Sequence, residues 1–196
     1  MADLTFNLVF LGDSLTEGVP HYNGETDTVA FQVSQRFPGS TYTKLGYRSQ
    51  TSDYLLGRLS CLLDLHKPDT DYRNILVLWA GTNDMALIQD SVNSTYNNLS
   101  AIARVARAIG WKVVIVTIIA RDNYFAAGID ATEFGACASA LNDRLRQLQD
   151  FDAVADPAKV LTDPGSPMYW DKCHLMPPGY TAVADLVAAA IASIPQ

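Results

Sequence analysis

The serine in the run Gly12–Leu15 (GDSL) is the first residue whose type and position could support catalysis. Ser14 follows an apolar stretch that predicts a buried strand, so its hydroxyl would stand at the edge of a sheet as a nucleophile. Two other interpretations fit the same run. It could be an anion-binding turn, in which backbone N–H groups hold a phosphate such as that of a flavin, or it could simply cap a helix.

A carboxylate and a histidine form the second candidate group, near the other end of the chain. Asp171 precedes His174 by three residues, a spacing at which the carboxylate reaches the ring if the intervening turn is helical. One ring nitrogen would then donate to Asp171, and the other would accept a proton from a nucleophile, as in a serine triad. The spacing is common, and alone it equally describes a surface turn before a helix that opens at Pro177.

Two further loops carry candidate donors for an oxyanion. Asn83 stands in the run Gly81–Asp84 (GTND), where its side-chain amide would suit a developing negative charge, although these are also ordinary turn residues. The loop Lys44–Ser52 contains Gly46, which permits close backbone approach and an exposed N–H.

The elements that must position these residues alternate along the chain. Predicted strands span Leu4–Leu11, Ser40–Leu45, Asn74–Trp79, Lys112–Ile119 and Phe151–Ala155. Predicted helices span Val29–Phe37, Ser52–Leu65, Ser91–Ile109, Thr132–Gln149 and Pro177–Ile194. This order predicts an α/β fold, a parallel sheet with helices on both faces. Because ligands bind beyond the carboxyl ends of such strands, the post-strand loops should meet at one edge.

The composition of the 196-residue chain narrows the class of protein. A 48% hydrophobic and 18% charged sequence predicts one globular domain over residues 1–196. The net charge of -7 argues against nucleic-acid partners and anionic membranes. Three scattered cysteines and three histidines predict neither a disulfide framework nor a metal site. The apolar stretch after Asp3 is short, so we expect a core strand, no membrane insertion and a cytoplasmic protein.

Together and in this order, the motifs resemble those of the SGNH, or GDSL-type, hydrolase superfamily. The resemblance rests on GDSL at 12–15, GTND at 81–84 and Asp-x-x-His at 171–174. It implies a flavodoxin-like, three-layer α/β/α sandwich whose five-stranded parallel sheet has the order 2-1-3-4-5. It also implies that Ser14 is the nucleophile, His174 the general base and acid, and Asp171 the residue that orients it. The Ser14 N–H and the Asn83 amide would bind the oxyanion.

One block departs from the pattern of this family, which commonly reads Asn-x-Gly-x-x-Gly-x-Thr. Alignment on Thr51 places Lys44 at the asparagine, Gly46 at the first glycine and Ser49 at the second, the oxyanion-hole position. Since the contribution is a backbone N–H, serine can supply it. We therefore expect Ser49 to be the second backbone donor, with Gly46 as the alternative.

These inferences predict a serine hydrolase that cleaves small-molecule carboxylic esters without a metal or an organic cofactor. Asp13 and Asp84 would brace the site loops or cap helices. Loops at Pro20–Asp27, Met85–Asp90 and Arg121–Gly128 mix aromatic and polar residues, which favours short acyl groups and polar alcohols, such as acetylated carbohydrates. The alternatives are a lysophospholipase or thioesterase for longer acyl chains, and a non-catalytic flavodoxin-like protein that binds a phosphate or a carbohydrate.

Overall fold

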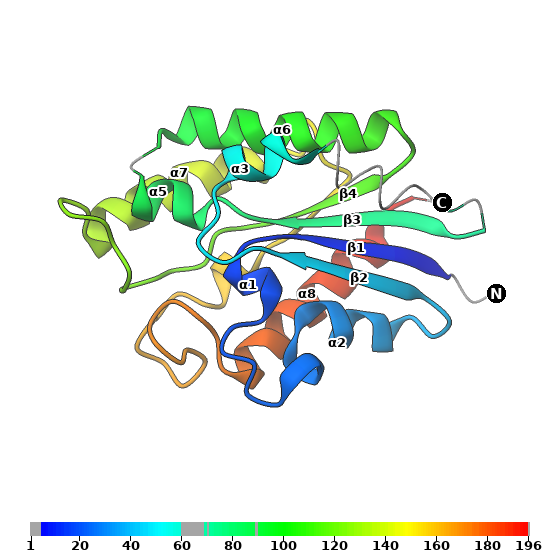
Figure 1. Ribbon diagram of the computed structural model, residues 1–196, viewed down its shortest axis with the longest axis horizontal. Coiled ribbons are helices and arrows are strands. Elements are labelled where there is room, and N and C mark those ends of the chain that lie inside the picture. The colour runs from blue at the N-terminus through cyan, green and yellow to red at the C-terminus, as the bar shows by residue number, and fades with distance from the viewer. Residues whose placement is uncertain (1–4, 60–68, 70, 89, 196) are drawn as a thin grey trace.

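A single parallel sheet organises the computed structural model, which describes residues 5–59, 69, 71–88 and 90–195. Its strands are β1 (Phe6–Gly12), β2 (Thr41–Gly46), β3 (Arg73–Trp79), β4 (Lys112–Val116) and β5 (Ala153–Ala155). All neighbouring strands pair in parallel, in the order β2-β1-β3-β4-β5 (Figure 1). The predicted fold class and strand order are confirmed.

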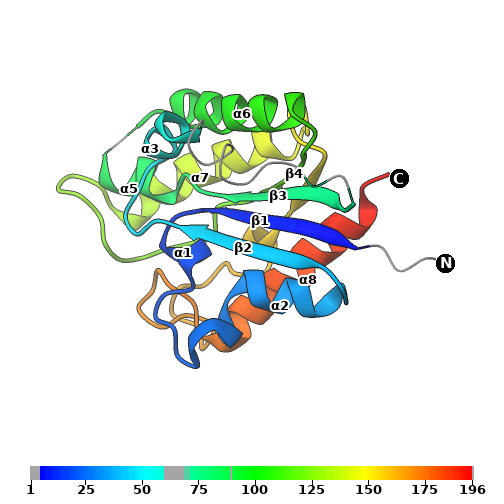
Figure 2. The same cartoon turned by 45° about the vertical axis from the view of Figure 1, so that its right-hand side comes forward.

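Helices cover both faces of this sheet. One face carries α1 (Ser14–Glu17), α2 (Val29–Arg36) and α8 (Pro177–Ser193), and α2 and α8 lie side by side beneath the strands (Figure 2). The other face carries α3 (Ser52–Gly57), α5 (Thr82–Leu87), α6 (Val92–Ala108) and α7 (Ala131–Leu145). Two short 3-10 helices, η1 (Gly24–Asp27) and η2 (Pro157–Lys159), lie in the connecting loops. The result is a three-layer sandwich.

The core is divided into two apolar layers by the pleat of the sheet. In β1, Phe6, Leu8 and Phe10 belong to the layer between the sheet and helices α2 and α8. Val9 and Leu11 belong to the layer on the opposite face. Successive side chains of a strand point to opposite faces, and both faces here are covered by helices. This is why the strands read as uninterrupted apolar runs in the sequence.

Several helices begin after a residue whose side chain caps them. Thr28, Thr51, Ser91 and Asp130 each accept a hydrogen bond from a backbone N–H in the first turn of α2, α3, α6 and α7. Pro177 opens α8, where its missing N–H has no helical partner to lose. Among the described residues, no helix is both long enough and apolar enough to cross a bilayer.

Several predicted boundaries differ from the structure, such as the end of α7 at Leu145 in place of Gln149. The run from Thr82 to Leu87 is a helix, not a loop, because Met85 and Ala86 are buried in the core. The strand predicted over Lys112–Ile119 ends at Val116, since the Asn142 side chain bonds both the N–H and the carbonyl of Ile118. Helix α3 ends at Gly57, and residues 60–65 of the helix predicted there lie outside the described part of the chain.

Candidate active site

The carboxyl edge of the sheet brings the motif loops together. Ser14 starts α1 directly after β1, and the turn between them is tight. A Cβ on Gly12 would lie 2.0 Å from the carbonyl oxygen of Trp79, so only glycine fits where β1 leaves the sheet. The Thr16 hydroxyl donates to that same carbonyl at 3.2 Å, which holds α1 over the end of β3. The serine is therefore fixed at the sheet edge by β1, β3 and α1.

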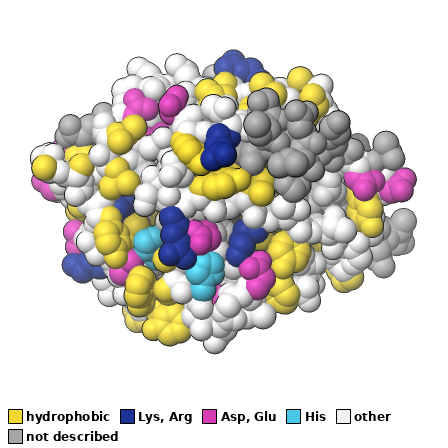
Figure 3. All heavy atoms as spheres, in the orientation of Figure 1, with side chains coloured by type: hydrophobic (Ala, Val, Ile, Leu, Met, Phe, Trp, Pro, Cys, Tyr) yellow, Lys and Arg dark blue, Asp and Glu magenta, His cyan; other side chains and the backbone are white. Residues whose placement is uncertain are grey.

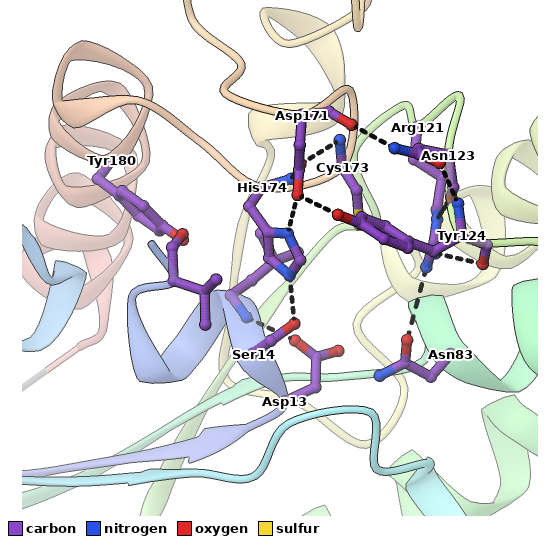
Figure 4. Close-up of polar contacts among 12 residues, drawn as sticks. Asp13, Ser14, Asn83, Arg121, Asn123, Tyr124, Asp171, Cys173, His174 and Tyr180 are labelled. Carbon is purple, nitrogen blue, oxygen red and sulfur yellow. Dashed lines mark hydrogen bonds and ion pairs between the residues drawn. The ribbon is translucent and has the colours of Figure 1, made fainter. Parts of the chain in front are cut away.

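Ser14, His174 and Asp171 form a continuous chain of hydrogen bonds (Figure 4). The Ser14 Oγ lies 2.8 Å from Nε2 of His174, and Nδ1 of the same ring lies 2.7 Å from Oδ2 of Asp171. An ionised carboxylate only accepts, so Nδ1 carries the proton and Nε2 is left to accept from the serine hydroxyl. The structure thus brings together the three residues that the motifs had singled out, in the arrangement that a general base needs.

The Asp171 carboxylate is held by the backbone as well as by the histidine ring. Its Oδ1 accepts from the N–H groups of Cys173 at 3.0 Å and His174 at 2.6 Å. Burial opposes ionisation of Asp171, but the hydrogen bonds from the ring and backbone of His174 outweigh it and lower the pKa. The turn between Asp171 and His174 is not helical: Lys172 has a left-handed φ of 66°, and its ammonium pairs with Asp122 at 2.8 Å. The carboxylate therefore reaches the ring without a helical turn.

A cavity of about 440 Å³ opens onto the triad. Its wall includes apolar Val19 and Leu87 together with the aromatic side chains of Tyr124 and Trp170, each 49% exposed. Cys173 also lines it, and burial raises the pKa of this thiol to about 12. A thiol with that pKa stays protonated at neutral pH, so Cys173 is a poor nucleophile there.

The two predicted backbone donors lie in different places. Ser49 lines the cavity, with its backbone in the left-handed region at φ 57°. Gly46 is the last residue of β2, opposite Gly12, and lies beneath α1. A Cβ on Gly46 would come within 2.2 Å of the backbone nitrogen of Glu17, so this glycine is needed for packing. The geometry favours Ser49 over Gly46 as a residue that can reach a ligand.

Asn83 lies in the first turn of α5 and faces the cavity. Its Nδ2 donates to the backbone carbonyl of Gln50 at 3.0 Å. Because only the amide nitrogen can donate to a carbonyl, this bond fixes which way the side chain is turned. One of the two Nδ2 hydrogens is used in this bond, and a second remains for a ligand.

The two carboxylates expected to brace loops or cap helices divide these tasks. Asp13 accepts from the N–H of Leu15 at 2.9 Å and caps α1, and burial raises its pKa to about 7. Asp84 is fully buried and accepts from both the backbone N–H, at 3.0 Å, and the hydroxyl of Ser52. It therefore ties the loop after β2, which carries Ser49, to the helix that carries Asn83.

Charged side chains gather at the rim of the site, over α1 and the end of β2 (Figure 3). Glu17 accepts from Nε of Arg48 at 2.8 and 2.9 Å, and Nε2 of His21 lies 3.4 Å from the same carboxylate. Of the aromatic residues expected near the substrate, Tyr124 lines the cavity, while Tyr22 is 56% exposed in the loop before η1. These rim contacts tie the first two site loops together.

Two residues that line the cavity make contacts with other site residues that the sequence did not predict. Arg121 is 4% exposed and reaches Asn83, and the Tyr124 hydroxyl donates to Asp171. Both lie in the loop Arg121–Gly128, which was assigned only to substrate contact. The available signal was position: Arg121 follows the fourth strand, at the same sheet edge as every other site loop.

The GDSL-like lipase/acylhydrolase family matches residues 10–182, and the chain belongs to this family. Membership confirms the resemblance predicted from the motifs and the enzyme class that it implies, a carboxylic ester hydrolase. Comparison of the sequence with curated proteins finds no match.

Solved structures share the fold over nearly the whole chain. A member of the lipolytic G-D-S-L family from Veillonella parvula has a TM-score of 0.75 at 16% identity, over 96% of this chain and 100% of that one. The psychrotrophic esterase EstA from Pseudoalteromonas sp. has a TM-score of 0.69 at 16% identity, over 95% and 96%. The acetyl xylan esterase AlAXEase has a TM-score of 0.71 at 18% identity, over 95% and 100%. At such identities the likeness concerns the fold.

Proposed function

We propose that this chain is a serine esterase that cleaves short-acyl esters, with acetylated carbohydrates as its substrate class, through an acyl-enzyme on Ser14. The observation that carries the proposal is the hydrogen-bonded chain from Ser14 through His174 to Asp171, with distances of 2.8 and 2.7 Å. These three hydrogen-bonded side chains lie at the wall of an open cavity, where an ester can approach the serine hydroxyl.

Acylation uses the two ring nitrogens of His174 in different ways. The Ser14 Oγ attacks the ester carbonyl carbon while its proton passes to Nε2, and Nδ1 keeps its hydrogen bond to Asp171. The tetrahedral intermediate collapses as the bond to the alcohol oxygen breaks. Nε2 gives its proton to that oxygen, so the alcohol leaves neutral and the acyl group stays on Ser14.

Deacylation repeats these steps with water. Nε2 takes a proton from the water as its oxygen attacks the acyl carbon, and then returns the proton to the Ser14 Oγ as the carboxylic acid leaves. In both halves the negative oxygen is stabilised by the N–H groups of Ser14 and Ser49 and by Nδ2 of Asn83. The ionised state of Asp171, held by its hydrogen bonds, stabilises the imidazolium that forms in each half.

The form of the cavity supports a small acyl group and a polar alcohol. A volume of about 440 Å³ is at the small end for ligand sites, and its apolar wall at Val19 and Leu87 suits a short alkyl chain. At the mouth, the half-exposed rings of Tyr124 and Trp170 offer flat apolar faces beside polar edges. Such faces suit the apolar side of a sugar ring.

Hydrolysis of p-nitrophenyl esters of graded chain length tests the proposal. Ser14→Ala and His174→Ala should each lower kcat by about three decades or more, since triad members act as a unit. Asn83→Ala should cost about two to three decades. Ser34→Ala is the matched control, because Ser34 is also buried but its hydroxyl donates to the Phe31 carbonyl within α2. Undiminished turnover by Ser14→Ala would refute the nucleophile assignment.

A second set of substrates tests the substrate class. We expect kcat/KM to be highest for acetyl and other short esters, and acetylated xylo-oligosaccharides to be hydrolysed faster than lysophosphatidylcholine. A maximum at long acyl chains would instead favour the lysophospholipase or thioesterase alternative. Binding of flavin mononucleotide by a chain that hydrolyses none of these esters would favour the non-catalytic alternative.

A further inference from the structure

A buried arginine sits behind the cavity. The Arg121 side chain is 4% exposed, and its guanidinium carbon lies 5.5 Å from the ring centre of Phe125 and 5.7 Å from that of Phe134. No carboxylate in the described part of the chain lies within ion-pair distance of it. Burial lowers the pKa of Arg121, yet an arginine stays charged in proteins. A cation kept in such a place needs hydrogen-bond partners, and they identify its task.

The guanidinium donates to two different parts of the site. Its Nη1 lies 3.3 Å from the Thr82 hydroxyl and 3.5 Å from Oδ1 of Asn83, on α5. Its Nε and Nη2 donate to the backbone carbonyls of Asn123 at 2.9 Å and Tyr124 at 2.7 Å. The planar guanidinium of Arg121 thus joins α5, which carries Asn83, to the loop after β4 (Figure 4).

We propose that Arg121 is a positioning residue that holds the Asn83 amide and the Asp171 end of the triad in register with each other. This inference rests on the proposed function, because it concerns the same site. It assigns to the arginine a task that no motif in the sequence specifies.

The first arm of the proposal acts on the oxyanion donor. Asn83 donates to the Gln50 carbonyl through Nδ2, so Oδ1 is the atom that faces Arg121. A positive charge at Oδ1 polarises the amide and makes the Nδ2 hydrogens stronger donors. The same contact holds the side chain in place, so little reorganisation is needed when an oxyanion forms.

The second arm acts on the triad carboxylate. Tyr124 has a left-handed φ of 56°, a conformation that costs free energy for a residue with a side chain and therefore needs support. Arg121 supplies that support at the Tyr124 carbonyl. The loop held in this way places two groups on Asp171: the Tyr124 hydroxyl, 3.0 Å from Oδ2, and Nδ2 of Asn123, 3.0 Å from the backbone carbonyl.

The test compares Arg121→Met and Arg121→Lys with wild type in hydrolysis of p-nitrophenyl acetate. Arg121→Met should lower kcat about 10- to 100-fold and change KM less than about 3-fold, because the lost contacts orient catalytic groups and do not bind the acyl chain. Arg121→Lys should keep the melting temperature near that of wild type and still lose about 10-fold in kcat, since one ammonium cannot replace the planar guanidinium. The Arg121→Lys variant therefore tests the proposal even if Arg121→Met does not fold.

A double-mutant background separates positioning from general stability. The double variant Asn83→Ala/Tyr124→Phe lacks both the amide and the hydroxyl through which Arg121 is proposed to act. In this background, Arg121→Lys should lower kcat less than about 3-fold further. Arg146→Met is the matched control: Arg146 bonds Asp156 and Asp143 away from the cavity, so this change should affect melting and not kcat. Unchanged kcat in Arg121→Lys, or its full loss repeated in the double background, would overturn the inference. Loss of activity in Ser14→Ala beside either result would show that the proposed function still stands.

Discussion

The Tyr124 hydroxyl donates a hydrogen bond to Oδ2 of Asp171 over 3.0 Å. The same oxygen accepts a hydrogen bond from Nδ1 of His174 at 2.7 Å. The Tyr124 ring lies tilted against the imidazole, with 5.8 Å between the ring centres. The bond to Asp171 raises the pKa of Tyr124, so the hydroxyl keeps its proton through the neutral range. Two donors therefore share the charge of one carboxylate oxygen.

Removal of this hydroxyl should change the pH dependence of the enzyme. In Tyr124→Phe the charge of Asp171 acts on His174 alone, which favours the protonated ring that cannot accept from Ser14. The acid limb of the kcat/KM profile should then move to higher pH. The measurement is p-nitrophenyl acetate hydrolysis between about pH 5 and about pH 9.

The control for this shift is Tyr22→Phe. Tyr22 is 56% exposed and lies before η1, so loss of its hydroxyl should leave the profile unmoved. An acid limb at the same pH in Tyr124→Phe and wild type would mean that the tyrosine does not influence the triad.

The backbone at Ser49 makes a separate prediction. A φ of 57° favours glycine, and the proposed contribution of this residue is its N–H, which every residue except proline has. Ser49→Gly should keep kcat within about 3-fold of wild type and raise the free energy of unfolding by up to about 1 kcal/mol. Ser49→Ala should keep kcat as well. Urea denaturation and ester hydrolysis measure the two effects, and a 10-fold or larger loss in both variants would point to the hydroxyl instead.

Much of the fold is predictable from the sequence because it follows from local patterns. The apolar runs around Leu8 and Val77 are buried on both sides, so they read as parallel strands, and the capping residue Ser91 marks the start of α6. The short helix α5 is not predictable in this way, since it spans only Thr82–Leu87 and no side chain caps it. Its helical form depends on burial of Met85, which is a tertiary effect.

The candidate site is also predictable only in part. Ser14, Asn83, Asp171 and His174 stand in motifs whose residue types state their chemistry, and the parallel sheet brings them to one edge. Arg121 stands in no motif, and its role depends on distances that only the folded chain has. The most specific contacts of the site are thus the ones that spacing along the chain does not reveal.

Gly46 should be required for stability because of its packing. A Cβ there would lie 2.2 Å from the backbone nitrogen and 2.4 Å from Cα of Glu17, so α1 would have to move, and Ser14 with it. Gly46→Ala should lower the free energy of unfolding by about 2 kcal/mol or more and reduce kcat. Gly57→Ala is the matched control, since a Cβ at that helical glycine meets nothing within 4 Å and should stabilise by up to about 1 kcal/mol. Wild-type behaviour of Gly46→Ala, by melting and by hydrolysis, would contradict the close approach.

The buried carboxyl of Asp13 should make stability depend on pH. Burial raises its pKa to about 7 in the folded chain, against about 4 for an unfolded chain. Between these values the folded state holds a proton that the unfolded state has released, so the free energy of unfolding falls as pH rises. The slope is about 1.4 kcal/mol per pH unit, and the total is up to about 4 kcal/mol by pH 7, beyond which it stays level.

Asp13→Asn should remove this dependence. The amide oxygen can still accept from the Leu15 N–H and cap α1, but the side chain no longer titrates. The variant should therefore gain stability relative to wild type as pH rises from about 4 to about 7, and the advantage should remain constant above that range. Urea denaturation at a series of pH values measures the difference, with exposed Asp71→Asn as the control. Parallel stability curves for wild type and Asp13→Asn would mean that the buried carboxyl ionises as readily in the folded chain as in the unfolded one.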